Sequence, residues 1–136
     1  MKRSVRAVSG IAALLSAGPA CALEVTRSRD IPAPPAAVWA LVGEFCAIGL
    51  WHPQVERCIL SREDDDDGIR AQIRGLVTKG GLGTIVEVEP ARDEAAMSYS
   101  YSFIQGPLPV RAYNATLADR PNGAGATVIW TATFDA

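Results

Sequence analysis

The second half of the chain alternates in residue type with a period of two, and this pattern most constrains the fold. Six segments carry it, at 55–62, 69–77, 84–89, 97–104, 111–118 and 126–134. Successive side chains of a β-strand point to opposite faces, so a period of two predicts strands. The connections between the segments are too short for helical crossovers, and the pattern therefore predicts an antiparallel meander.

The first half predicts one further strand and a helix. Residues 24–31 alternate weakly and predict a strand that the prolines after it end. Pro35 suits the first turn of a helix, and Val38, Leu41, Val42 and Phe45 follow at helical spacing. After this helix, Gly49 and Pro53 allow only a short second helical turn before the chain extends. The chain is thus predicted to be an α+β domain in which a helix faces a curled antiparallel sheet.

Large aromatic residues recur on one predicted face of the last three strands. Tyr99, Tyr101 and Phe103 share one side of their strand, and Tyr113 and Trp130 occupy the following strands. Small hydroxyl residues hold the opposite side. Aromatic walls with a few polar tips are typical of a ligand pocket. The alternative, that these rings only fill the core, remains open at this point.

In the segment 84–89, simple alternation places Val86 and Val88 inward and Glu87 outward in solvent. Arg70 and Arg74 share one face of the preceding strand. They are expected to be solvated, or else to meet an anionic ligand.

The N-terminus predicts a cleaved export signal. A basic head is followed by a short apolar run and by Ala20 and Ala22 in an A-x-A arrangement. We expect cleavage after Ala22, with residues 1–22 as the signal peptide and residues 23–136 as the domain. The product would be periplasmic or secreted, without a stable membrane anchor, because no later segment is long and apolar enough to span a bilayer.

The charge of the mature domain argues against nucleic-acid binding. Ten Lys and Arg against fifteen Asp and Glu after residue 22 leave a net charge of −5. Binding to phosphates requires clustered basic residues. The sequence contains no cluster of basic residues interleaved with aromatic residues.

Cys46 and Cys58 remain as an even pair in the mature chain, flanking the only histidine, His52. In an oxidising compartment such a pair is more often a disulfide than two thiols. A disulfide would clamp the helix end to the next strand, with Trp51 packed between. Two buried thiols are the alternative, and a metal site is disfavoured because only three ligands are at hand.

Segments along the whole mature chain carry a resemblance to a known superfamily. They are IPAPPAAVWALVGEF at 31–45, WHP at 51–53, RGLVTKGGLGTIVE at 74–87, YSY at 99–101, GPLPVRAYNATL at 106–117 and IWTATFDA at 129–136. The chain resembles the START-like (SRPBCC) superfamily, which includes a birch-pollen-allergen-like fold, and within it the polyketide cyclase/dehydrase branch. The resemblance implies a helix-grip fold, with about six to seven curved antiparallel strands around helices and a hydrophobic cavity beneath a long C-terminal helix.

The sequence departs from this pattern at one place. It stops at Ala136, directly after the last predicted strand, so the covering helix is expected to be missing. A fragment, an open groove or a homodimer that covers the face would each account for this, because isolated domains rarely expose a large apolar patch.

The expected function is to hold a small hydrophobic or amphipathic ligand, without cofactor or metal. The predicted ligand-binding residues are Trp51, Tyr99, Tyr101, Phe103, Tyr113 and Trp130. One alternative is a cyclase or dehydratase in which His52, Glu87 or Tyr101 moves protons. Another is a non-catalytic interaction protein that uses the open sheet face.

Overall fold

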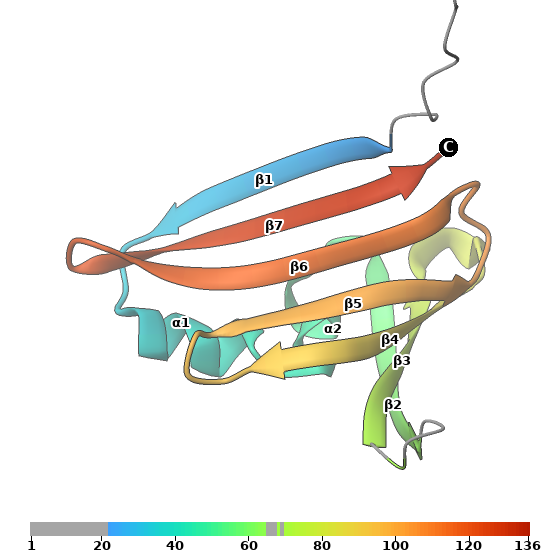
Figure 1. Ribbon diagram of the computed structural model, residues 1–136, viewed down its shortest axis with the longest axis horizontal. Coiled ribbons are helices and arrows are strands. Elements are labelled where there is room, and N and C mark those ends of the chain that lie inside the picture. Colours follow the sequence, from blue (N-terminus) through green and yellow to red (C-terminus); the bar gives the residue numbers. More distant parts are fainter. Residues whose placement is uncertain (1–21, 65–67, 69) are drawn as a thin grey trace, which may run out of the picture.

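The structure is a computed structural model that describes residues 22–64, 68 and 70–136. Seven antiparallel strands form one curved sheet, and the helices lie against one side of it (Figure 1). The strand order is β1-β7-β6-β5-β4-β3-β2. The predicted signal peptide at 1–22 lies outside the described residues except for Ala22, so its cleavage stays a prediction.

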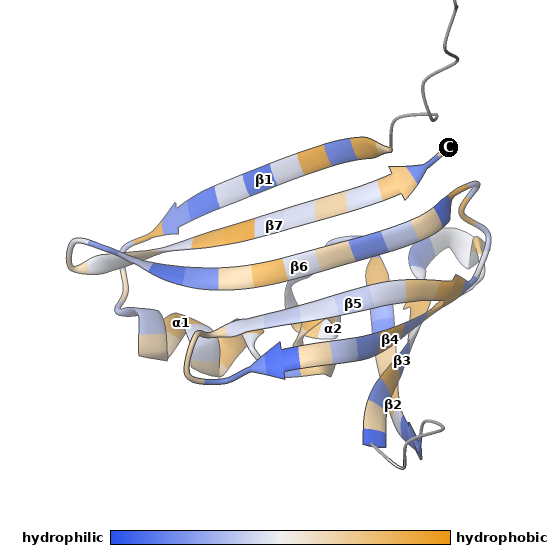
Figure 2. Cartoon of the chain, in the orientation of Figure 1, coloured by the Kyte–Doolittle hydropathy of each residue, from blue (hydrophilic) through white to orange (hydrophobic). Residues whose placement is uncertain are grey.

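The strands follow the predicted meander, with β1 returning to pair with β7. They are β1 (Leu23–Ile31), β2 (Val55–Asp64), β3 (Arg70–Thr78), β4 (Thr84–Asp93), β5 (Ser98–Gln105), β6 (Arg111–Asn122) and β7 (Gly125–Asp135). The α+β helix-grip architecture is therefore confirmed in its strands and their antiparallel order. Figure 2 shows hydrophilic residues along the middle of β1, between hydrophobic residues near its two ends.

The helix predicted over 35–45 is shorter than expected, whereas the short second helical turn predicted before Pro53 is present. Helix α1 (Pro35–Val42) stops early, and a 3₁₀ turn η1 (Phe45–Ala47) and a short helix α2 (Ile48–Trp51) follow. Gly43 closes α1 by donating its N–H to the Trp39 carbonyl at 2.7 Å, and a Cβ there would stand 2.6 Å from the Trp39 ring. Leu41, placed on the buried face by its spacing, is 72 % exposed because the helix ends before that face is complete.

An arginine of β4 holds the end of α1 against the sheet. Arg92 donates to the Gly43 carbonyl at 2.7 Å and also binds Glu89 and Glu94. The Trp39 indole donates to Glu94 at 2.8 Å, so helix and strand share one polar cluster. A cation at the last helical carbonyls is favourable, since the C-terminal end of the helix dipole is negative.

The core lies where the helical segment meets the middle of the sheet. Its main cluster comprises Phe45, Tyr99, Tyr101, Ala115, Leu117 and Ala132. A second cluster joins Ile48 of α2 to Val55 and Leu76 of the neighbouring strands. The fully buried Phe45 comes from η1, and Trp39 and Val42 of α1 pack against the same cluster.

Cys46 and Cys58 form the predicted disulfide, with their Cα atoms 5.5 Å apart. It links η1 to β2 and so fixes the turn that carries Phe45. The expectation that Trp51 packs between the two is wrong. Trp51 is 45 % exposed and belongs to neither core cluster.

We expect the double variant Cys46→Ala/Cys58→Ala to lose about 3 kcal/mol of unfolding free energy, because the crosslink constrains the unfolded chain. Urea denaturation measures the loss, and wild-type protein in reductant should match the variant. The purified, unreduced protein should show no alkylatable thiol at either position by mass spectrometry. Two reactive thiols there would contradict the disulfide.

Candidate ligand-binding site

Two adjoining hollows lie between the sheet and the helical segment. The first has a volume of about 440 Å³ and is bordered by residues of all seven strands, of α2 and of the loops beside them. The second, of about 540 Å³, lies between β1, β6 and β7 on one side and the helices on the other. Both are bordered by Arg27, Trp51, Leu117 and Trp130, so they form one continuous groove.

A buried arginine of β3 forms the floor of the first hollow. The side chain of Arg74 has no exposed surface. Its Nε donates to Glu87 Oε2 at 2.7 Å, and one terminal nitrogen, Nη1, donates to the Phe45 carbonyl at 2.6 Å and to the Tyr99 hydroxyl at 3.5 Å. The other terminal nitrogen, Nη2, has no hydrogen-bond partner among the described residues. Arg74 thus ties three separate segments together.

Aromatic rings enclose the same guanidinium. Its central carbon lies 4.1 Å from the centre of the Phe45 ring and 4.5 Å from that of Tyr101. Cation–π contacts of this kind gain strength when the cation is desolvated. Tyr99 packs edge-on against Phe45, with ring centres 5.6 Å apart. The aromatic wall of the hollow is therefore arranged around a fixed positive charge.

Glu87 points into the hollow, and the prediction that it faces solvent is wrong. Arg74 and Glu87 are direct cross-strand partners, and Glu87 is 6 % exposed. Simple alternation favoured burying Val86 and Val88, but a buried arginine requires a counter-charge on the same face. Both valines are only partly buried, on the other side of β4. Arg74, expected from the sequence to be solvated or to meet an anionic ligand, is buried because Glu87 neutralises its charge. Arg70 is exposed as expected.

The electrostatics of the pair follow from burial and mutual attraction. Burial raises the pKa of Glu87, Arg74 opposes that shift, and the net pKa stays above its usual value. Burial alone would lower the pKa of Arg74, but the charges and hydrogen bonds of Glu87 and Tyr99 raise it overall. An arginine in a protein stays protonated, so Glu87 is held as the carboxylate that neutralises it.

Two polar groups of the aromatic wall, the indole N–H of Trp130 and the hydroxyl of Tyr101, form a hydrogen bond. The Trp130 indole N–H donates to the Tyr101 hydroxyl at 2.7 Å. An indole nitrogen only donates, so the Tyr101 oxygen accepts and its own O–H donates onward. The centre of the neighbouring Tyr113 ring lies 6.3 Å from that of Tyr101, and burial raises the pKa of Tyr113. Tyr113 is half-buried and borders the hollow, where its hydroxyl can donate to a ligand.

Tyr101 and His52, two of the candidate proton-moving residues, are both neutral in this setting. Burial raises the pKa of Tyr101 far above its ordinary value, so its phenol keeps the proton. Burial and the positive charge of Arg74 lower the pKa of His52. His52 Nδ1 accepts the Gln54 N–H at 3.1 Å, which places the proton of the neutral ring on Nε2.

The structure brings most of the predicted site residues together. Trp51, Tyr99, Tyr101, Tyr113 and Trp130 border the first hollow, as do the catalytic candidates His52 and Glu87. Phe103 borders neither hollow, although it shares a strand with Tyr99 and Tyr101. Sequence reasoning missed Arg27 and Leu108, and the alternation of β1 is the signal that could have placed Arg27.

Among the described residues, no group of three or more potential metal ligands is present. Within the same part of the chain, no helix is long and apolar enough to cross a bilayer. Asp119 is buried on β6 with neither carboxylate oxygen hydrogen-bonded, and burial raises its pKa. It borders neither hollow and takes no part in the site.

A family model for polyketide cyclase/dehydrase and lipid transport proteins matches residues 22–136. The chain belongs to this family. The resemblance in its sequence to the START-like superfamily is thereby confirmed. A comparison with curated proteins gives no match.

Solved structures of this family's superfamily share the fold. A protein from Thermobifida fusca is 34 % identical, with 83 % of this chain and 74 % of that chain covered and a TM-score of 0.68. Protein XoxI from Bacillus cereus is 26 % identical, with 82 % and 74 % covered and a TM-score of 0.68. The Zhui aromatase/cyclase from Streptomyces sp. R1128 is 16 % identical, with 84 % and 68 % covered and a TM-score of 0.69, which shows a shared fold alone.

We expect Arg74→Met to lower the unfolding free energy by about 3–5 kcal/mol, because it leaves the Glu87 carboxylate buried without a partner. The double variant Arg74→Met/Glu87→Leu should recover most of that loss. Urea denaturation of both variants measures the effect.

The matched control is Arg70→Met, on the same strand. Its ion pair with Asp64 is exposed, with side chains 71 % and 62 % accessible, so the cost should stay below about 1 kcal/mol. An equal cost for the two arginines would show that the buried pair does not hold the site together.

Proposed function

We propose that this protein is an exported carrier that binds a small hydrophobic or amphipathic ligand in the groove between sheet and helices. The observation that carries the proposal is the first hollow itself, of about 440 Å³. It lies within the size range of small-molecule sites and combines aromatic and aliphatic walls with a few fixed polar groups. The family description, which includes lipid transport, supports the same class of ligand.

The polar groups that border the hollow indicate which functional groups the ligand carries. The Trp130 indole donates to the Tyr101 hydroxyl, and the hydroxyl of the neighbouring Tyr113, which borders the hollow, is a donor for a ligand. His52, with its proton on Nε2, adds a second donor at the border of the hollow. A ligand that places a carbonyl or ether oxygen here satisfies these donors, whereas one that offers only donors leaves them unpaired.

Export of the carrier rests on two separate features. The predicted signal sequence at 1–22 directs the chain out of the cytoplasm. The Cys46–Cys58 disulfide is of the kind that forms and persists in oxidising compartments.

A second candidate function is catalysis of cyclisation or dehydration. Glu87, His52 and Tyr101 border one hollow, so a bound substrate would lie within reach of three groups able to exchange or polarise protons. A ligand recovered unchanged after incubation supports the carrier. Turnover that disappears in Glu87→Gln supports the enzyme.

If the protein is a carrier, each chain should bind one molecule of methyl dodecanoate, a neutral amphiphile with a hydrogen-bond acceptor. Leu117→Trp should abolish binding, because Leu117 borders both hollows and the larger side chain fills the groove. Tyr113→Phe, which removes one donor, should weaken binding about fivefold. Isothermal titration calorimetry measures affinity and native mass spectrometry measures stoichiometry.

The control for overpacking is Leu60→Trp, at an exposed site on β2. It should bind as the wild type does, and circular dichroism should show both tryptophan variants folded. Wild-type protein that binds no amphiphile, or a folded Leu117→Trp variant that binds normally, refutes the carrier.

A further inference from the structure

Two arginines of the edge strand border the second hollow. Arg27 pairs across the sheet with Trp130, and Arg29 pairs with Val128. All four residues border this hollow, so the arginines, the indole and the valine share one face of the β1–β7 pair. Both arginines are exposed, in the hydrophilic middle of β1 (Figure 2). The second hollow therefore has a basic side and an apolar side.

These two positive charges have no acidic neighbour in the groove. Arg27 donates to the adjacent Thr26 carbonyl at 3.0 Å, and in the described part of the chain neither it nor Arg29 forms an ion pair. Among the described residues that border either hollow, Glu87 is the one acid, and Arg74 already neutralises it. The groove is thus locally positive, although the chain carries a formal net charge of −2.

Because the two hollows are continuous, the positive charge is distributed unevenly along the groove. Arg29 borders only the second hollow, and Arg27 stands with Trp51, Leu117 and Trp130 where the two hollows join, so the positive charge lies on the second-hollow side of the groove and the donors of the first hollow lie beyond it. A small apolar ligand would need only the first hollow. A groove with one basic end and a long apolar middle matches an elongated molecule that is acidic at one end.

We propose that the ligand is an elongated anionic amphiphile whose acidic group lies between Arg27 and Arg29. Its apolar body extends along Trp51, Leu117 and Trp130 into the first hollow. This inference rests on the proposed carrier function and adds the chemical class and the orientation of the ligand.

The alternative anion site, at Arg74, is disfavoured by charge and burial. Arg74 is fully buried and already neutralised at 2.7 Å by Glu87, so an added anion would bury an uncompensated charge. At β1 the acidic group keeps part of its hydration and meets two cations that lack a carboxylate. The polar contacts of β1 therefore set which end of the ligand faces solvent.

Dodecanoate and methyl dodecanoate test the proposal, because they differ in the charged head and share the apolar chain. By isothermal titration calorimetry, wild-type protein should bind the acid about tenfold more tightly than the ester at low ionic strength, with a smaller ratio at physiological salt. Arg27→Gln/Arg29→Gln should weaken binding of the acid about tenfold and leave the ester within about twofold.

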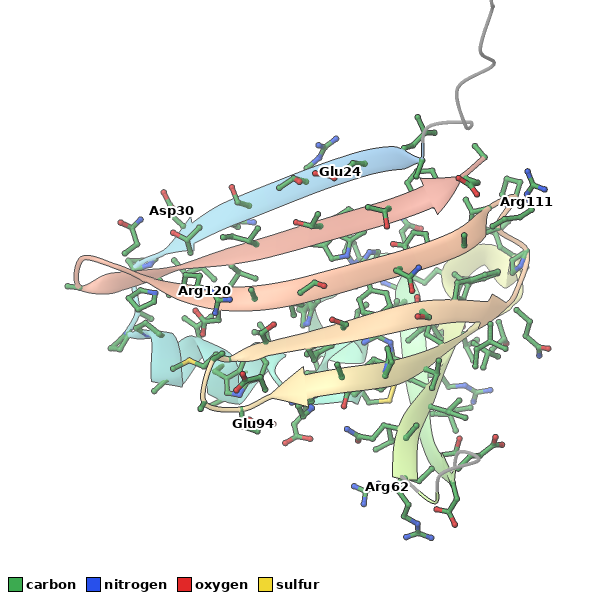
Figure 3. The ribbon with its side chains drawn as sticks, in the orientation of Figure 1. Glu24, Asp30, Arg62, Glu94, Arg111 and Arg120 are labelled. Carbon is green, nitrogen blue, oxygen red and sulfur yellow. A yellow bond between two sulfur atoms is a disulfide. The ribbon has the colours of Figure 1, made fainter. Side chains whose placement is uncertain are left out.

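Arg62→Gln is the matched control. Arg62 lies on β2, whose hairpin projects away from β1 (Figure 3), and the substitution should change neither affinity. Size-exclusion chromatography of each variant reports the oligomeric state and confirms that it is folded.

Equal affinities for acid and ester, or a double variant that weakens both alike, overturn the anion site and leave the carrier function standing. Failure of both compounds to bind refutes the carrier function itself. The wild-type protein could also form a dimer that is absent in the double arginine variant and fail to bind the acid. That result would show that a second copy of the chain occupies the groove, and it would overturn the inference.

Discussion

The ion pair between Arg74 and Glu87 is the interaction on which the interior depends. Burying two charges is costly, and it is tolerated only with good geometry and further hydrogen bonds. Here the guanidinium also binds the Phe45 carbonyl and stacks on the rings of Phe45 and Tyr101. The turn η1, the β3–β4 hairpin and β5 are thereby joined at one point, close to the Cys46–Cys58 disulfide.

This arrangement explains why the interior of so small a domain retains a hollow. A core made only of aliphatic residues packs to high density, because nothing limits how closely the layers approach. Around Arg74, the rings of Phe45, Tyr99 and Tyr101 are held by the cation, and the two tyrosines are also held by contacts of their hydroxyl groups. The wall is rigid and partly polar, which suits a site that must orient an amphipathic ligand rather than only enclose it.

Sequence reasoning predicted the antiparallel sheet and the aromatic wall because the strands β5 to β7 keep a clear period of two. It failed at Glu87, where hydrophobicity favoured the neighbouring valines. A hairpin turn centred on the glycines that follow β3 would have placed Arg74 opposite Glu87 and predicted a buried pair. The short α1 was missed because the close contact of Gly43 with Trp39 is tertiary and leaves no periodic signal.

The NMR signal of the Arg74 guanidinium in ¹⁵N-labelled protein tests the buried cation directly. We expect a resolved Nε–H resonance that exchanges slowly with water and shows contacts to ring protons of Phe45 and Tyr101. The exposed Arg70 provides the reference for fast exchange within the same spectrum. An Arg74 signal that exchanges as fast as that of Arg70, without ring contacts, would contradict a buried cation at the floor of the hollow.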